Sequence, residues 1–265
     1  MATAVFVHAH PDDEAIATGG TMARMADEGH RVVLVCATGG ELGEVEEGFL
    51  SPGETLAQRR AAELDRAARE LGVARVTSLG YRDSGMAGET SNDDPRCFWR
   101  ADVDEAAARL ADILRAERAD VLTIYDERGT YGHPDHVQVH RVGRRAAELT
   151  AVPRLFMATV NRNHLLRLMQ SADPDVLATL GGGPESIDNL GVDEGRITTA
   201  VDVTAFLDRK RRAMAAHASQ ITETSFFLRM PVDMFGAVWG TEWYIRVGAE
   251  PARPFETSLA DPDPR

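Results

Sequence analysis

The first 150 residues of this chain alternate short apolar runs with longer segments of helical period. Because the runs are apolar on both faces, we expect parallel strands covered by helices on both sides of one sheet. Such strands are predicted at 4–9, 31–37, 75–81 and 120–126. Helices are predicted at 15–28, 55–72, 102–118 and 137–150. The alternation predicts a Rossmann-like, doubly wound and mostly parallel α/β sheet with right-handed crossovers, for which 3-2-1-4-5 is a candidate strand order.

The pattern becomes less regular after residue 150. Residues 172–196 are rich in Pro, Gly and Asp and are predicted to form a loop or lid, and the tail 250–265 is predicted to be frayed. Other elements are predicted as a fifth strand at 154–160, a helix at 163–171, a strand and a helix within 196–219, and an edge strand at 243–248. No repeat or linker is evident. We therefore predict a single domain over 1–265, with a Rossmann-like core in 1–150 and a C-terminal elaboration in 151–265 that shapes the pocket.

The composition is that of a globular protein with a large negative charge. Apolar residues make up 43% of the 265, and 42 acidic against 29 basic residues give a net charge of -13. This charge repels phosphate backbones and anionic lipid surfaces, so neither nucleic acid nor membranes are expected as partners. The N-terminus has no basic leader, and no apolar stretch reaches the roughly 20 residues that span a bilayer, so we predict a cytoplasmic protein. Cys36 and Cys97 are expected to be reduced thiols.

Two clusters of histidine and acidic residues follow the first and fourth predicted strands. HPDDE occupies 10–14, and GHPDH occupies 132–136. In an open parallel sheet, ligands bind beyond the carboxyl ends of the strands, and the order 3-2-1-4-5 makes these two strands neighbours. The clusters are therefore expected to face each other across one crevice. Taken alone, the first also fits a helix start and the second a loop capped by Asp135.

Metal binding explains the composition of both clusters. His10 and Asp13 can supply an imidazole nitrogen and a carboxylate oxygen to one ion, and His136 can supply a third ligand. Two histidines and one carboxylate leave positions open for water and substrate, as in catalytic zinc sites, and iron(II) suits the same ligands. Asp12 is then placed to act as general base for the water, and His133 to donate a proton or stabilise developing charge.

These clusters and three other segments resemble the PIG-L/LmbE-like family of metal-dependent N-deacetylases, which includes the deacetylase and the conjugate amidase of mycothiol metabolism. The resemblance covers about the first 150 residues in order. The matching segments are HAHPDDE (8–14), GGELGE (39–44), RAAELDRAARELG (60–72), YRDSGMAG (81–88) and TYGHPDHVQVH (130–140). The resemblance implies a zinc hydrolase on a Rossmann-like fold, with the metal on His10, Asp13 and His136 and the general base at Asp12.

The resemblance also implies roles for residues around this centre. Asp135 would orient His133, and Tyr131 would reach toward the oxyanion. Arg60 and Asp83 match positions that hold the sugar or its substituent. Each of these two has a structural alternative, an ion pair on a solvated helix face for Arg60 and stabilisation of the RDSG turn for Asp83.

Other polar and aromatic residues are given smaller roles. Glu41, after the second strand, is a further candidate for contact with the substrate. Trp239 and Trp243 are interpreted as core residues rather than as a platform for a sugar. The remaining histidines are interpreted as packing or surface residues, at 8, 30, 140, 164 and 217. The glycine pairs at 19–20 and 39–40 do not form G-x-G-x-x-G, so no dinucleotide is expected.

We therefore predict a zinc-dependent amide hydrolase, with iron(II) as the alternative metal, that removes the acetyl group from an N-acetylglucosaminyl substrate. N-acetylglucosamine joined to inositol, a mycothiol-type precursor, is the most specific candidate. The nearest alternatives are a mycothiol S-conjugate amidase and a deacetylase of another acylated sugar, although Ala17 stands where the amidases typically carry a lysine. A non-haem iron oxygenase and a non-catalytic sugar-binding protein are more remote. The expected partner is a small acylated amino sugar, and a homo-oligomer is left open.

Overall fold

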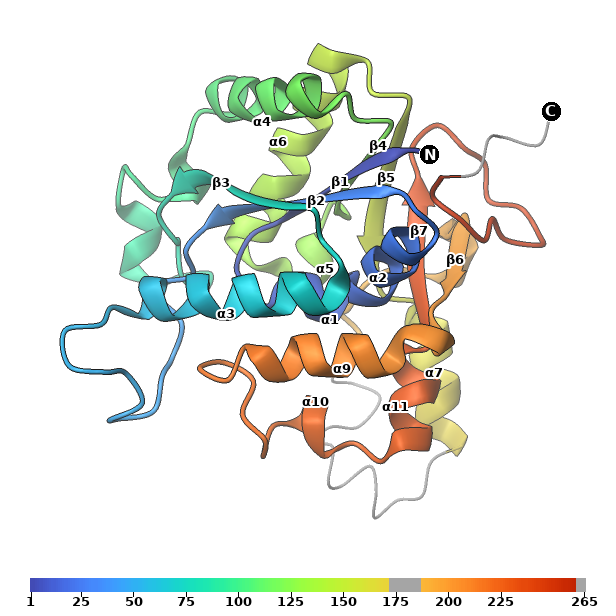
Figure 1. Ribbon diagram of the computed structural model, residues 1–265. Coiled ribbons are helices and arrows are strands. Elements are labelled where there is room, and N and C mark those ends of the chain that lie inside the picture. Colours follow the sequence, from blue (N-terminus) through green and yellow to red (C-terminus); the bar gives the residue numbers. More distant parts are fainter. Residues whose placement is uncertain (172–186, 261–265) are drawn as a thin grey trace.

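The computed structural model describes residues 1–171 and 187–260. Its centre is a seven-stranded sheet in the order β3-β2-β1-β4-β5-β7-β6 (Figure 1). The strands are β1 Thr3–His8, β2 Arg31–Thr38, β3 Arg75–Tyr81, β4 Val121–Tyr125, β5 Arg154–Thr159, β6 Thr199–Asp202 and β7 Thr241–Arg246. Strands β1 to β5 run parallel, whereas β7 runs antiparallel to both β5 and β6. The mostly parallel α/β sheet and the order 3-2-1-4-5 are confirmed.

Helices connect the strands and cover both faces of the sheet (Figure 1). They are α1 Asp13–Ala17, α2 Gly19–Asp27, α3 Leu56–Leu71, α4 Val103–Glu117, α5 Gly129–Gly132, α6 Pro134–Thr150, α7 Arg162–Ser171, α9 Leu207–Ala216, α10 Phe226–Arg229 and α11 Val232–Trp239. Their ends follow local signals in the sequence. Thr55 and Gln58 form a capping box at the start of α3, and Gly72 ends that helix in the left-handed region at φ 74°.

Alternate residues of the strands build two separate cores. Phe6 and Leu34 belong to one core, together with residues of α2, α3 and α9. Val5 and Val33 belong to the other, together with residues of α4 and α6. Because successive side chains of a strand point to opposite faces, this alternation covers the sheet on both sides and leaves its carboxyl edge open for a site.

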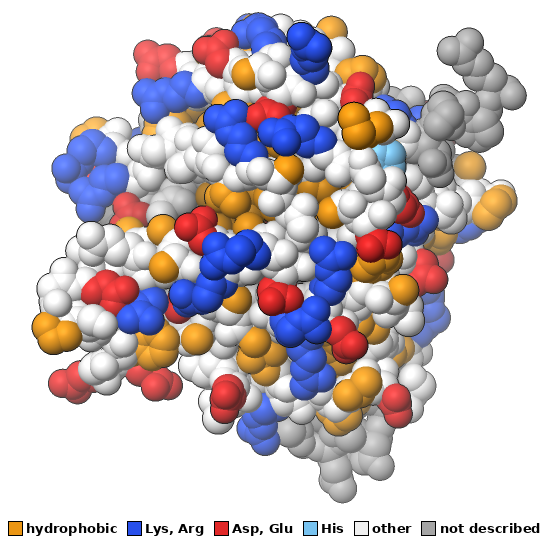
Figure 2. All heavy atoms as spheres, in the orientation of Figure 1, with side chains coloured by type: hydrophobic (Ala, Val, Ile, Leu, Met, Phe, Trp, Pro, Cys, Tyr) orange, Lys and Arg blue, Asp and Glu red, His pale blue; other side chains and the backbone are white. Residues whose placement is uncertain are grey.

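The C-terminal helix α9 packs along α3, and charged side chains tie the two together. Figure 2 shows basic side chains interspersed with acidic ones on this face of the molecule. The Arg212 Nε atom lies 2.7 Å from Glu70 Oε2, and Arg209 Nε donates to the Glu70 carbonyl oxygen at 2.8 Å. Residues beyond 150 therefore become part of the same layer as a helix of the predicted core.

The first predicted helix, 15–28, is in fact two helices. The chain breaks at Thr18, where φ is -137° and ψ is 8°. The backbone N–H groups of Gly20 and Thr21, in the first turn of α2, donate to the two carboxylate oxygens of Glu242, each at 2.8 Å. The break was not predicted because Glu242, which caps the start of α2, belongs to β7, far away in the sequence.

Further departures from expectation lie in the C-terminal half. Strand β7 is not an edge strand, because it pairs with β5 on one side and β6 on the other. The tail is not frayed as far as it is described, since Glu256 pairs with Thr199 and Leu259 is only 1% exposed. Helices α10 and α11 were not predicted, and most of the predicted loop or lid lies outside the described residues.

Two smaller expectations concern cysteines and membranes. Cys36 and Cys97 are both free and buried, as expected for reduced thiols. Among the described residues, no helix combines the length and the apolarity that crossing a bilayer requires. The single-domain assignment stays a prediction.

Candidate active site

The two histidine and aspartate clusters lie at the carboxyl ends of the neighbouring strands β1 and β4, where they were expected to meet. Both line one cavity of about 1170 Å³. The predicted site residues that line it are His10, Asp12, Asp13, Arg60, Asp83, Tyr131, His133 and His136. Within the described part of the chain, Glu41 and Asp135 do not line this cavity. The fold therefore brings eight of the ten predicted residues around a common space.

The Asp13 carboxylate lies between two imidazole rings. Its Oδ2 atom is 3.3 Å from Nδ1 of His10 and 3.3 Å from Nε2 of His136. Two ligands that each lie about 2.0–2.1 Å from a tetrahedral ion are separated by about 3.3–3.4 Å, so both spacings fit a shared divalent ion. Within the described residues, the buried His136 Nε2 makes no hydrogen bond of acceptable geometry. A buried nitrogen without a hydrogen bond is expected of a metal ligand, so the predicted set fits a metal.

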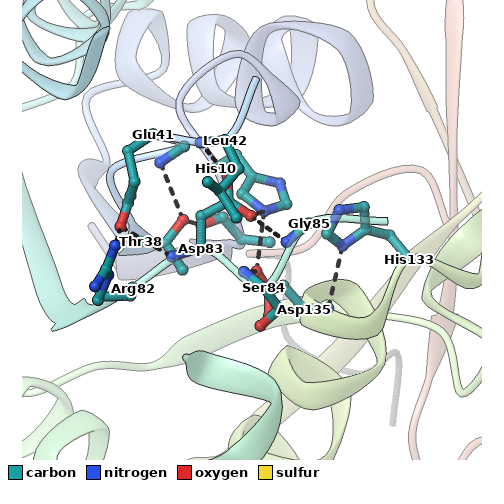
Figure 3. A network of polar contacts seen from close by, with 12 residues as sticks. His10, Thr38, Glu41, Leu42, Arg82, Asp83, Ser84, Gly85, His133 and Asp135 are labelled. Carbon is teal, nitrogen blue, oxygen red and sulfur yellow. Dashed lines mark hydrogen bonds and ion pairs between the residues drawn. The ribbon is translucent and has the colours of Figure 1, made fainter. Parts of the chain in front are cut away.

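Acidic side chains on the far side of His10 fix the orientation of its ring (Figure 3). Its Nε2 atom lies 3.2 Å from Asp135 Oδ2 and 3.5 Å from Asp83 Oδ1. A carboxylate can only accept, so Nε2 carries the proton and Nδ1 is left to face Asp13. Ser84 donates to Asp135 through both its backbone N–H and its hydroxyl group.

Two triplets of side chains other than the predicted set could also hold an ion. His10 forms one with Asp83 and Asp135, and one with His133 and His136. In the first, the carboxylates already accept hydrogen bonds from backbone N–H groups, including that of Gly85. Their oxygens are therefore better suited to orienting His10 than to binding the ion themselves.

His133 is the residue before helix α6 and caps its N-terminus. The backbone N–H of Asp135 donates to His133 Nδ1 at 3.1 Å, so Nδ1 carries no proton and Nε2 carries one. Burial, reinforced by His10 and His136, lowers the pKa of His133 to about 4. This residue is therefore a neutral N–H donor near pH 7. The hydrogen bond from Asp135 to His133 comes from the Asp135 backbone, whereas the Asp135 carboxylate is directed at His10.

Asp12 has an unusual backbone conformation and a perturbed carboxylate. Its φ is 118°, a region that residues other than glycine rarely adopt. Its N–H donates to Glu14 Oε2 at 2.8 Å, and its Oδ1 lies 3.2 Å from Nη2 of Arg60. Burial raises the pKa of Asp12 to about 6, against the opposing effect of the Arg60 charge. A carboxylate with this pKa is matched to proton transfer near neutral pH.

Arg60 lies inside the molecule rather than on a solvated helix face. The residue is 3% exposed, and its guanidinium donates to the carbonyl oxygens of Gly40 and Pro11. The contact with Asp12 completes this arrangement. Arg60 therefore ties the loop after β1 to the loop after β2, and it also lines the cavity.

Asp83 and Glu41 form a second bridge between loops (Figure 3). The Asp83 carboxylate accepts from the backbone N–H groups of Leu42 and Gly85, at 3.2 and 2.9 Å. Glu41 Oε1 accepts from the Asp83 backbone N–H at 3.2 Å and lies 3.8 Å from Nε of Arg82. Asp83 thus stabilises the turn, as its structural alternative predicted, while its side chain still reaches the cavity. Glu41 supports Asp83 from outside the cavity.

Tyr131 is the most exposed of the predicted residues. It lies on the short helix α5, is 49% exposed, and its ring meets that of His136 edge to face at 4.9 Å between centroids. The preceding residue, Thr130, has φ 67° and donates its N–H to Asp126 Oδ1 at 2.9 Å. Partial burial and the neighbouring carboxylates raise the pKa of Tyr131, so its hydroxyl keeps its proton and can donate a hydrogen bond.

Several residues around the site were missed or undervalued by sequence reasoning. The Tyr125 ring stacks on His136 at 4.2 Å, and its hydroxyl lies 3.0 Å from Nδ1 of His8. Glu14 and His217, both fully buried, contact each other at 2.6 Å between Oε1 and Nε2. Glu14 ends the HPDDE motif, which was the available signal for it, whereas His217 had been interpreted as a packing or surface residue.

Comparison with known families decides what kind of protein this is. The family model described as PIG-L, GlcNAc-PI de-N-acetylase, matches residues 5–147, more than half of the chain. The chain belongs to the PIG-L family. This confirms the resemblance seen in the sequence and the expectation of an amide hydrolase, and it removes support for a non-haem iron oxygenase.

Individual relatives agree with the PIG-L assignment. A 1D-myo-inositol 2-acetamido-2-deoxy-alpha-D-glucopyranoside deacetylase of Acidothermus cellulolyticus is 44% identical, with 91% of this chain and 87% of the relative covered. A deacetylase of the same name from Streptomyces griseus is 42% identical, over 94% of this chain and 84% of the relative. Both matches therefore extend over most of the relative's own length.

Solved structures share the fold. N,N'-diacetylchitobiose deacetylase from Pyrococcus horikoshii is 26% identical, with a TM-score of 0.59, and the match covers 92% of this chain and 83% of that one. A 4-carboxy-2-hydroxymuconate hydratase from Pseudomonas putida is 21% identical, with a TM-score of 0.62 and 96% and 100% covered. The second likeness shows the fold alone, and its different reaction means that function must be argued from the site.

Proposed function

We propose that this PIG-L protein is a metal-dependent deacetylase that removes the acetyl group from an N-acetylglucosaminyl substrate, with N-acetylglucosaminyl-inositol as the specific candidate. The observation that carries the proposal is the Asp13 carboxylate, 3.3 Å from an imidazole nitrogen of both His10 and His136, beside the perturbed carboxylate of Asp12. The names of the relatives support the sugar and the inositol.

The metal would be held by His10, Asp13 and His136. Bound Zn²⁺ or Fe²⁺ would supply a Lewis acid and lower the pKa of a bound water toward neutrality. The orientation of His10 by Asp135 supports this assignment, since metal-binding histidines usually donate their other ring N–H to a carboxylate or carbonyl.

Asp12 is the general base in this proposal. Near pH 7 a carboxylate of pKa about 6 is mostly ionised, so it can accept a proton from the attacking water. Arg60 holds the carboxylate oriented and ionised. The neutral His133 donates its Nε2–H to the oxyanion that develops on the amide, and the Tyr131 hydroxyl donates from the exposed side.

Protonated Asp12 is also the better candidate for the general acid. A neutral imidazole holds its remaining N–H proton far more tightly than a carboxylic acid of pKa about 6 holds its own. We infer that Asp12 returns its proton to the departing nitrogen, which releases acetate and a free amine. His133 then contributes a hydrogen bond but no proton.

The two ends of the cavity differ in polarity. Arg60, Asp83, Glu44 and Glu89 line it beyond β2 and β3. Leu165, Met169, Phe227, Val238 and Trp239 line it on helices α7, α10 and α11. Helix α7 follows β5 and helix α11 precedes β7, so most of this apolar wall comes from segments next to strands on the other side of the β1–β4 pair from β2 and β3. A sugar suits the first wall, and an apolar group suits the second.

The apolar wall favours one second candidate, an amidase that acts on a mycothiol S-conjugate. Such a substrate joins a polar sugar to an apolar substituent through an amide, which matches the two walls. Trp239, which belongs to this wall, and Trp243 both line the cavity, so neither is wholly a core residue.

The test is primary-amine release from a small panel of amides. N-acetylglucosaminyl-inositol, N-acetylglucosamine and a mycothiol S-conjugate are incubated with zinc-loaded or iron(II)-loaded protein, and Asp12→Asn serves as the matched control of nearly equal shape. We expect release from the acetylated sugars, fastest with the inositol compound, and a loss of at least about 100-fold in the variant. Release from the conjugate alone would favour the amidase, and equal rates in the variant would exclude Asp12 as the base.

A further inference from the structure

A C-terminal segment lies directly behind the catalytic loop. His217 follows α9, well beyond the residues 5–147 that match the family model. Its Nε2 atom lies 2.6 Å from Glu14 Oε1, and both side chains are fully buried. The other carboxylate oxygen of Glu14 accepts the Asp12 backbone N–H at 2.8 Å. A chain of two contacts therefore runs from His217 to the backbone of the proposed base.

The backbone of Asp12 needs such support. At φ 118° its conformation is costly for a residue with a side chain, and it persists only when surrounding contacts hold it. The Glu14 carboxylate provides one such contact, but a buried carboxylate must itself be fixed by a partner. His217 is that partner. Relaxation of φ at Asp12 would turn its carboxylate away from the cavity.

The same segment also reaches the side chain of Asp12. Gln220 Oε1 accepts from Nη1 of Arg60 at 3.3 Å, and Arg60 Nη2 lies 3.2 Å from Asp12 Oδ1. Ser219 anchors the segment on α3, where its N–H and hydroxyl donate to the buried Glu63 carboxylate at 3.0 and 2.6 Å. Residues 217–220 therefore hold Asp12 at both its backbone and its carboxylate.

We propose that His217 is a positioning residue for amide hydrolysis, which fixes the Asp12 backbone through Glu14 and so sets the direction of the catalytic carboxylate. The proposal rests on the proposed function for the role of Asp12 as the base. Within the described residues, His217 does not line the cavity, so it acts through Glu14 and not by touching the substrate. The alternative is a buried histidine that serves packing alone.

The test compares His217→Gln with His217→Asn. The glutamine amide nitrogen ends near the position of Nε2 and can donate to Glu14, whereas the asparagine amide ends near Nδ1 and cannot reach it. We expect the glutamine variant to keep kcat within about threefold, and the asparagine variant to lose about 30- to 100-fold with KM and metal content nearly unchanged. His30→Asn is the matched control, because His30 contacts the Ala2 N–H at the opposite end of the sheet.

A second readout does not depend on the substrate. Hydrogen exchange of the Asp12 backbone amide, followed by NMR, reports its bond to Glu14 directly. We expect protection in the wild type and the glutamine variant, and faster exchange in the asparagine variant. Equal kcat values in the two variants, or unchanged exchange at Asp12, would overturn the proposal. A wild type that cleaves none of the panel would instead reject the proposed function, while the exchange measurement still decides the role of His217.

Discussion

Asp12 shows how two opposing effects adjust the pKa of a single buried carboxylate. Burial raises its pKa, and the Arg60 guanidinium limits that rise to a value of about 6. Burial without Arg60 would leave the group protonated over more of the neutral range, and exposure would make it too weak a base. The balance between these two effects sets the pH at which the proposed enzyme works.

The pH dependence of activity follows from this balance. The base must be ionised, so kcat/KM measured at saturating zinc should fall as the pH falls through about 6. Arg60→Gln removes the effect that lowers the pKa of Asp12, so the acid limb should move to higher pH. Arg59→Gln is the control on the same helix, since Arg59 pairs with Glu54 instead. A limb that stays in place in the Arg60 variant would show that another group titrates there.

Asp135 should influence the metal more than the oxyanion. Its carboxylate holds the His10 ring, so Asp135→Asn should weaken zinc binding by about 10- to 100-fold, the usual effect of removing such a partner. Competition with a chelating dye measures the affinity. His133→Gln is the comparison. Because His133 lies outside the proposed ligand set, this variant should lower kcat with little change in zinc affinity. The opposite pattern would assign Asp135 to His133, as the resemblance implied.

At the scale of elements, a buried ion pair joins the C-terminal half to helices α1 and α2. Lys210 of α9 is wholly buried, and its Nζ lies 2.5 Å from Glu242 Oε1 and 2.7 Å from the Ile16 carbonyl oxygen. Glu242 in turn caps α2 at Gly20 and Thr21. Helices α1 and α2 therefore depend on β7 and α9 for both their break and their position.

Glu242→Gln tests this dependence. It leaves the Lys210 charge buried without its partner, which typically costs about 3–5 kcal/mol in the free energy of unfolding. Urea unfolding followed by circular dichroism measures the loss. Glu70→Gln removes the exposed ion pair with Arg212 and should cost less than about 1 kcal/mol. Similar losses in the two variants would mean that the buried pair contributes no more than a surface one.

At the scale of the whole molecule, local patterns predicted the first half of the chain and its cluster of site residues. The apolar runs and the helix caps lie within short windows, and parallel topology then placed His10 and His136 at one edge of the sheet. Contacts between residues more than 200 positions apart cannot be predicted from such local patterns. The cap that Glu242 provides and the bond between His217 and Glu14 are of this kind, separated by 222 and 203 positions from their partners.

Residues that are far apart in the sequence are also synthesised at different times. The HPDDE motif leaves the ribosome before His217 and Glu242 do. A nascent or prematurely ended chain that already carries His10, Asp13 and His136 still lacks the groups that fix Asp12 and divide α1 from α2. Such a fragment would carry the proposed metal ligands before the contacts that position the proposed base are in place. The proposed site is therefore completed only after Glu242 has been made.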